Sequence, residues 1–123
     1  MSSLVLFVND LATMKKFYAD LLAYQVSEEV ESFARMSSGS DELVLHQIPE
    51  EYLEQISNPP KLREDCVWKP TFTVDSVATS RAVAIELGGA VADESRQWEL
   101  GDYVYCNGND PEGNVIQVRQ LVR

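Results

Sequence analysis

The stretch Val8-Asn9-Asp10-Leu11-Ala12-Thr13 returns 66 residues later as Val74-Asp75-Ser76-Val77-Ala78-Thr79. A short β-like run comes before each stretch, at 4–8 and at 67–74, and an amphipathic helix pattern follows it. Because the two copies present the same features in the same order, the sequence predicts a repeated α+β module. Each copy is expected to run strand, helix and then three strands.

Both expected helices have an apolar stripe, with residues recurring every three or four positions. The second helix is expected to begin after Asp75 or Ser76, since either residue is a plausible N-cap, and to end at Gly88-Gly89. The apolar stripes are Leu11, Met14, Phe17, Tyr18, Leu21 and Leu22 in the first helix, and Val77, Ala84 and Leu87 in the second.

Turn residues divide the rest of each module into short strand-like runs. The runs are 24–32, 33–36 and 42–48 after the first helix, with a turn at 37–40, and 90–93, 97–100, 103–106 and 115–122 after the second, with a turn at 110–114. Between the modules, Pro59-Pro60 and many charges mark a connector with one helical turn at 51–56. We predict a single domain, 1–123, with a first βαβββ module at 1–48, a connector at 49–65 and a second βαβββ module at 66–123.

Side chains alternate along a strand, so each run divides into an apolar face and a mixed face. The apolar face is expected to carry the helices, and Trp68 is assigned to it. The mixed face combines Phe7 and Val44 with polar groups such as Lys69 and Arg119. A solvated sheet surface and a concave ligand pocket both fit this mixed face.

The composition excludes several classes of function. The 123 residues include 20 Asp plus Glu against 10 Lys plus Arg, which gives a net charge of −10 and a pI near 4.4. This charge argues against nucleic acid and anionic membrane surfaces as partners. No apolar run is long enough to span a membrane and no signal peptide pattern is present, so a cytoplasmic location is expected. Cys66 and Cys106 are expected to be reduced, packed thiols.

Several segments together resemble one protein family. They are Phe7-Val8-Asn9-Asp10-Leu11, Phe17-Tyr18, Leu21-Leu22 and the closing Asp110-Pro111-Glu112-Gly113-Asn114-Val115-Ile116-Gln117. This pattern resembles the glyoxalase, bleomycin resistance and extradiol dioxygenase superfamily, also called vicinal oxygen chelate proteins. The resemblance implies two paired βαβββ modules that form a curled mixed sheet around a cavity, with the helices on the outer face. It also implies a homodimer.

Metalloenzymes of that superfamily bind a divalent ion through His and Glu side chains. By resemblance, the ligand positions fall on Ser3, Val44, Lys69 and Gln117, with His46 the nearest donor to Val44. A hydroxyl, a valine, an amide and a cationic lysine cannot supply the three ligands of a catalytic metal site, so we expect no metal and no cofactor. Lys69 is expected either to bind an anionic group of a ligand, with Gln117 and His46 as hydrogen-bond partners, or to pair with a nearby carboxylate.

The leading hypothesis is a metal-independent, homodimeric binding protein that holds a small-molecule ligand on the mixed face. Its expected ligand-binding residues are Phe7, Val44, His46, Lys69, Thr71, Trp98, Tyr103, Tyr105, Gln117 and Arg119. One alternative is a glyoxalase-like enzyme, an isomerase, lyase or dioxygenase relative that uses His46 and Lys69 in acid–base chemistry. A further alternative is an interaction module whose concave face is filled by a partner or by its own side chains.

Overall fold

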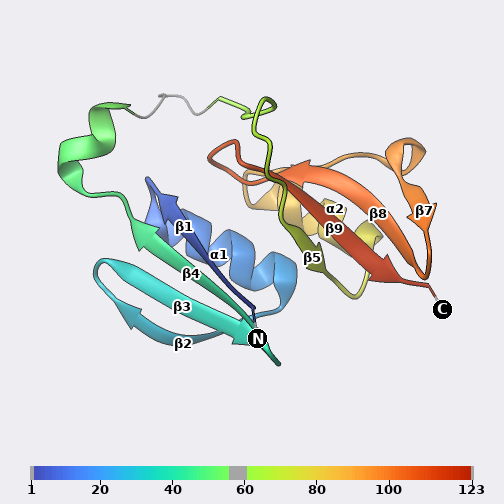
Figure 1. The fold of residues 1–123 in the computed structure, drawn as a ribbon, viewed down its shortest axis with the longest axis horizontal. Helices are drawn as coiled ribbons and strands as arrows, with labels where there is room; N and C mark the ends of the chain where they lie inside the picture. The colour runs from blue at the N-terminus through green and yellow to red at the C-terminus, as the bar shows by residue number, and fades with distance from the viewer. Residues whose placement is uncertain (1, 56–60, 123) are drawn as a thin grey trace.

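The computed structural model describes residues 2–55 and 61–122, which form two mixed β-sheets and two α-helices (Figure 1). The N-terminal sheet has the strand order β1-β4-β3-β2 and the C-terminal sheet the order β5-β9-β8-β6, with β7 also paired to β8. The N-terminal elements are β1 (Ser2–Val8), α1 (Leu11–Leu22), β2 (Gln25–Val30), β3 (Phe33–Ser38), β4 (Asp41–Gln47) and the 3-10 helix η1 (Glu50–Gln55). The C-terminal elements are β5 (Thr71–Thr73), α2 (Val77–Glu86), β6 (Ala90–Val91), the 3-10 helix η2 (Glu94–Arg96), β7 (Trp98–Leu100), β8 (Tyr103–Asn109) and β9 (Val115–Leu121).

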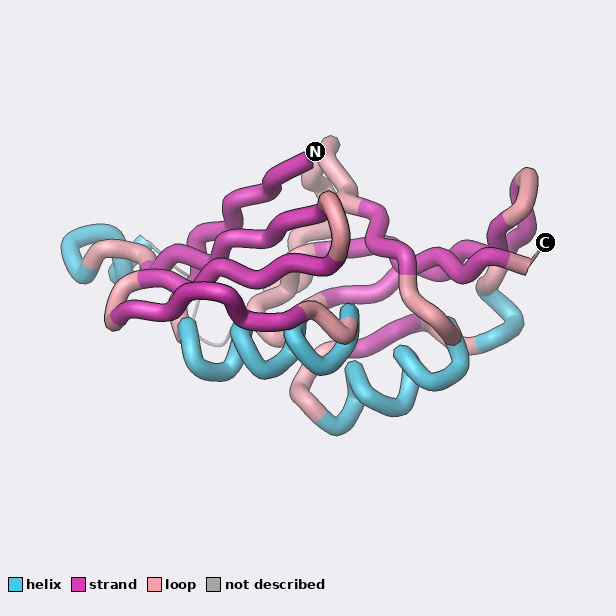
Figure 2. The backbone as a smooth tube through the Cα atoms, turned by 90° about the horizontal axis from the view of Figure 1, so that it is seen from below, coloured by secondary structure: helices cyan, strands magenta, loops and turns pink. Residues whose placement is uncertain are grey.

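The two sheets repeat one pairing pattern. The first strand of each module pairs in parallel with the last, β1 with β4 and β5 with β9, while the remaining pairs are antiparallel. The two helices lie on the same side of the sheets and leave the opposite side open (Figure 2). The α+β class and the helices on one outer face, as predicted from the sequence, are therefore confirmed.

Each helix begins at an equivalent side chain. Asp10 caps α1 by accepting a hydrogen bond from the Thr13 amide, and Ser76 caps α2 by accepting one from the Thr79 amide. Of the two caps expected for the second helix, the structure selects Ser76. Gly88 then takes a positive φ of 94° at the end of α2, a conformation that glycine adopts without steric cost.

The core lies between the helices and the inner faces of both sheets. The expected stripe of α1 is buried except for Leu11, which is partly buried, and Met14 and Phe17 are fully enclosed. Cβ alternation places Leu43 and Leu45 of β4 inside, together with Ile116 and Val118 of β9.

A buried turn at residues 110–114 joins the two modules. The Asp110 carboxylate accepts hydrogen bonds from the Tyr18 hydroxyl at 2.6 Å, from the Glu112 amide, and from both the amide and the side chain of Asn114. Burial first, and the Asp110 charge second, raise the pKa of Tyr18 well above its ordinary value, so the phenol remains a donor. Glu112 in turn accepts the Asn9 and Asp10 amides just before α1. The closing turn that carries the family resemblance thus holds the N-terminal helix in place.

Several sequence-based expectations are wrong in detail. The run 67–74 forms a strand only at Thr71–Thr73, because Pro70 has no amide donor, and strand alternation therefore does not extend to Trp68. Trp68 is 81% exposed instead of lying in the core. Cys106 is buried but Cys66 is exposed rather than packed. The turn at 37–40 is shorter, since Ser37 and Ser38 pair with β4, and β8 continues past 106 to Asn109.

Two further expectations concern the connector between the modules and membrane-spanning helices. A 3-10 helix covers Glu50–Gln55, where one helical turn was expected at 51–56, and residue 56 lies outside the described residues. In the described part of the chain, no helix is both long and apolar enough to cross a membrane.

Candidate functional site

The open faces of the two sheets carry the ten residues that the sequence singles out. Register places Phe7 beside His46 on the N-terminal sheet, with Val44 on the same face. The other seven belong to the C-terminal sheet or its approach: Lys69, Thr71, Trp98, Tyr103, Tyr105, Gln117 and Arg119. Among the described residues, no hydrogen bond, ion pair or ring contact joins the two groups.

The polar part of the C-terminal group is a chain of hydrogen bonds across β5, β9 and β8. Thr71 donates its hydroxyl to the Gln117 side-chain oxygen at 2.9 Å. The Gln117 amide nitrogen and Lys69 Nζ both donate to the Asn107 side-chain oxygen, each at 3.3 Å. Lys69 therefore contacts an amide, and the alternative of a carboxylate partner for Lys69 is wrong within the described residues.

The aromatic part follows directly along β8. Trp98 stacks on Tyr105 with ring centroids 5.6 Å apart and an interplanar angle of 9°. The Arg119 guanidinium carbon lies 4.0 Å above the centre of the Tyr103 ring, and Arg119 Nε donates to the Thr73 hydroxyl. A guanidinium held between an aromatic ring and a hydroxyl keeps N–H groups available for a ligand.

The N-terminal group is mostly apolar and aromatic. The His46 ring lies between Phe7 and Phe33, with centroid distances of 5.3 and 6.3 Å. Its Nδ1 is 2.9 Å from the Gln47 backbone oxygen. Because Phe7 is 57% exposed, this surface presents a ring to the outside of the molecule.

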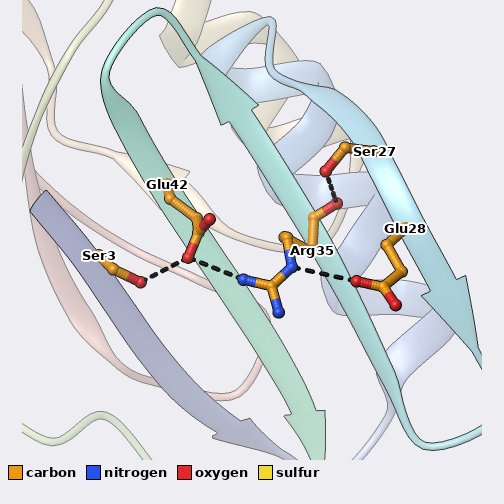
Figure 3. Close-up of polar contacts among 5 residues, drawn as sticks. All are labelled: Ser3, Ser27, Glu28, Arg35 and Glu42. Atoms are coloured by element: carbon orange, nitrogen blue, oxygen red, sulfur yellow. Dashed lines mark hydrogen bonds and ion pairs between the residues drawn. The ribbon is translucent and has the colours of Figure 1, made fainter. Parts of the chain in front are cut away.

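A charged network on the same face includes two residues that the sequence reasoning missed, Glu42 and Arg35 (Figure 3). The Glu42 carboxylate accepts the Ser3 hydroxyl at 2.7 Å and Arg35 at 3.0 Å, and Arg35 also donates to Glu28 at 3.2 Å. Ser3 and then Arg35 hold the pKa of Glu42 below its ordinary value. Strand alternation from Val44 and His46 was the signal for Glu42, which lies two residues before Val44.

Replacement of Ser3 by alanine is expected to raise the pKa of Glu42 toward its ordinary value, because the Ser3 hydrogen bond is the largest cause of the depression. A depressed carboxyl pKa stabilises the fold above the ordinary pKa, and this stabilisation is lost as pH falls through the folded-state pKa. Ser3→Ala should therefore make stability less dependent on pH in that acidic window. A carbon-detected NMR titration of the Glu42 carboxyl measures the pKa.

The control for that titration is Ser27→Ala. Ser27 donates to the Arg35 backbone oxygen and does not contact the carboxylate (Figure 3). Equal pKa changes in the two variants would contradict the assigned role of Ser3.

The residues at the implied metal positions do not fit a divalent ion. Ser3 Oγ donates a hydrogen bond to Glu42, and the Val44 side chain has no atom that could bind a metal. Lys69 presents an ammonium group that would repel a cation. In residues 2–55 and 61–122, no group of three or more His, Cys, Asp or Glu side chains is arranged to hold a metal. At and beside the implied metal position on the C-terminal sheet, the side chains Lys69, Thr71, Asn107 and Gln117 supply amides, a hydroxyl and a cation.

A cavity of about 760 Å³ in the described part of the chain lies over the C-terminal sheet. We call it the C-terminal cavity. Its lining comes from the segment before β5, from β6 and β8, and from η2, and includes Cys66, Lys69, Ala92, Arg96, Asn107 and Asn109. Of the ten expected ligand residues, only Lys69 lines it. A smaller, apolar cavity of about 160 Å³ lies between the modules, where Leu4, Tyr18, Trp68 and Ile116 meet.

Comparisons with known proteins find matches to this chain both in sequence and in fold. A family model for a glyoxalase-like domain matches residues 3–119. A virulence protein of Salmonella typhimurium is 23% identical over 121 residues, which is 97% of this chain and 82% of that protein.

Solved structures with the same fold cover nearly the whole chain. A glyoxalase/bleomycin resistance protein/dioxygenase family enzyme from Burkholderia phytofirmans has a TM-score of 0.72 at 22% identity, covering 98% of this chain and 97% of that one. The fosfomycin resistance protein FosX from Mesorhizobium loti has a TM-score of 0.66 at 13% identity, with 98% and 90% covered. At these identities the structures establish the fold.

Proposed function

This chain belongs to the glyoxalase-like domain family, in the vicinal oxygen chelate superfamily, and we propose that it is a metal-independent small-molecule binding protein within that family. The ligand is held on the open face of the sheets, and a homodimer in the cytoplasm is the working form. Nucleic acid and membranes are not partners in this proposal.

The observation that carries the proposal is the chemistry at the implied metal positions. Lys69 and Gln117 both donate to the amide oxygen of Asn107, and among the described residues no group of three or more His, Cys, Asp or Glu side chains could hold a metal. The neighbouring aromatic side chains and Arg119 provide flat contact area and directed donors, which is the usual composition of a small-molecule site.

The exposed apolar side chains of the open face support the homodimer. Val5 and Phe7 on β1 are 52% and 57% exposed, and Leu121 on β9 is 55% exposed. Apolar side chains exposed next to one another, as Val5 and Phe7 are on β1, mark surfaces that contact a partner or a ligand. A second copy would cover these side chains and enclose the ligand.

The enzyme alternative has less support within one chain. It would use His46 and Lys69 together, but His46 belongs to the N-terminal sheet and Lys69 to the approach to β5. Because no contact between described residues connects them, the two groups form no acid–base pair in a single copy.

Native mass spectrometry of the freshly purified protein tests this function. We expect a dimer that carries an organic molecule, which is released on denaturation. Tyr105→Ala and Arg119→Gln should each lower the occupancy at least several-fold, because they remove ring and guanidinium contacts. Tyr52→Ala is the control, since Tyr52 is 51% exposed on η1. A monomer without a bound molecule, or equal occupancy in all three variants, would contradict the proposal.

A further inference from the structure

We propose that the C-terminal cavity takes a compact oxyanion, a carboxylate or a phosphate group of the ligand, held by Lys69 and Arg96. The inference rests on the proposed function in treating the ligand as a small molecule. It adds that the ligand carries a negatively charged group. That group binds in the C-terminal cavity, away from the aromatic surface of Trp98 and Tyr105.

The first argument is the pairing of charges in a strongly acidic protein. The net charge is −10, yet the ion pairs among the described residues lie in the N-terminal module, on Lys15, Lys16 and Arg35. Within the same described ranges, Lys69 contacts the Asn107 amide oxygen, and Arg96 forms no ion pair. Hydrogen bonds from Ser95, and to a lesser extent the charge of Arg96, lower the pKa of nearby Asp93. Neither cation of the cavity is therefore in an ion pair with a carboxylate of the described residues.

The second argument is how the fold forms the cavity. The edge strand of the C-terminal sheet is interrupted, since β6 and β7 both pair with β8 but are separated by η2. This interruption places Arg96 at the cavity wall. Small side chains, Ala90 and Ala92, together with Gly108, leave the volume of about 760 Å³ open above the strands.

The third argument is the set of hydrogen-bond donors. The Asn107 side-chain oxygen already accepts hydrogen bonds from Lys69 and Gln117. No described residue accepts a hydrogen bond from the Asn107 amide nitrogen, so this donor is available to a ligand. An amide N–H₂, an ammonium and a guanidinium together form a donor-only set that suits an oxyanion. Glu64 is the one carboxylate in the lining, which leaves the cavity lining with a net positive charge.

NMR titration of the protein with inorganic phosphate and with acetate tests the inference, against sodium chloride at matched ionic strength. We expect saturable shifts at the Asn107 and Asn109 amides with at least one of the two anions and none with chloride. Lys69→Gln and Arg96→Gln should each weaken that binding about tenfold, since each removes one charged hydrogen bond. Saturation by acetate alone assigns the site to carboxylates, and saturation by phosphate alone assigns it to phosphates.

The matched control is Lys16→Gln, because Lys16 is paired with Asp20 on the surface of α1, outside the cavity lining. Its affinity for the anion should equal that of the unchanged protein. The inference is overturned if neither anion gives saturable shifts, or if Lys69→Gln and Arg96→Gln bind as tightly as Lys16→Gln. The proposed function would survive either result, provided that the organic molecule remains bound in native mass spectra.

Discussion

Asp110→Ala is expected to lower the free energy of unfolding by about 3–5 kcal/mol, which is a large share of the roughly 5–15 kcal/mol typical of a domain. Asp110 is fully buried and accepts four hydrogen bonds, two from backbone amides and two from side chains. Alanine would leave those buried donors without an acceptor. Each buried donor left without a hydrogen bond costs about 1–3 kcal/mol when no water accepts from it instead. The expected fall in Tm is roughly 10–20 °C.

Urea denaturation at fixed protein concentration measures this loss. Asp65→Ala is the matched control, since Asp65 is exposed and should change stability by less than about 0.5 kcal/mol. Asp110→Asn should fall between the two, because one carbonyl oxygen is retained. If Asp110→Ala were as stable as Asp65→Ala, the turn would not have the structural role assigned to it.

Glu112→Ala is expected to destabilise the protein by about 2–3 kcal/mol through the junction of the two modules. The Glu112 carboxylate lies in the C-terminal module but accepts the Asn9 amide at 2.8 and 2.9 Å and the Asp10 amide at 2.7 Å. Loss of the carboxylate would leave the entry to α1 without its acceptors. Glu112→Gln should cost about half as much, because it keeps an acceptor and loses the charge.

Native-state hydrogen exchange separates this local effect from a global one. Compared with the unchanged protein, Glu112→Ala should increase the exchange rates of the Asn9 and Asp10 amides more than those of the β8 amides. Glu31→Ala, at an exposed turn, should leave all of these rates unchanged. Unchanged protection at Asn9 and Asp10 in Glu112→Ala would show that the contact across the modules contributes little.

The repeat predicts much of this fold because helix caps and side-chain alternation are local properties. Asp10 and Ser76 are 66 residues apart, and both cap their helices as the repeat requires. Alternation also placed Phe7, Val44 and Arg119 together on the mixed face, which is the open face of the sheets. It failed at Trp68 because the local backbone is not a strand there.

The site was less predictable because it depends on pairings between distant segments. The break between the runs 90–93 and 97–100 was expected, but Arg96 lies at a cavity wall only because η2 fills that break and both flanking strands pair with β8, which the sequence does not indicate. Asn107 was missed because the strand was expected to end at 106, whereas pairing with β9 extends β8 to Asn109. The partners of Lys69 could be assigned only once that extension was known.

The measurement that tests the central claim most directly is calorimetric titration of the purified protein with Mn²⁺, Ni²⁺ and Zn²⁺, followed by native mass spectrometry. The account predicts no saturable binding of one ion per chain, because Lys69 and Gln117 supply a cation and an amide at the implied metal positions and no described group of three His, Cys, Asp or Glu side chains could hold a metal. The organic molecule should remain bound at unchanged occupancy. One tightly bound ion per chain, lost in Gln117→Ala, would contradict the account. It would indicate that the protein is a metal-dependent member of its family.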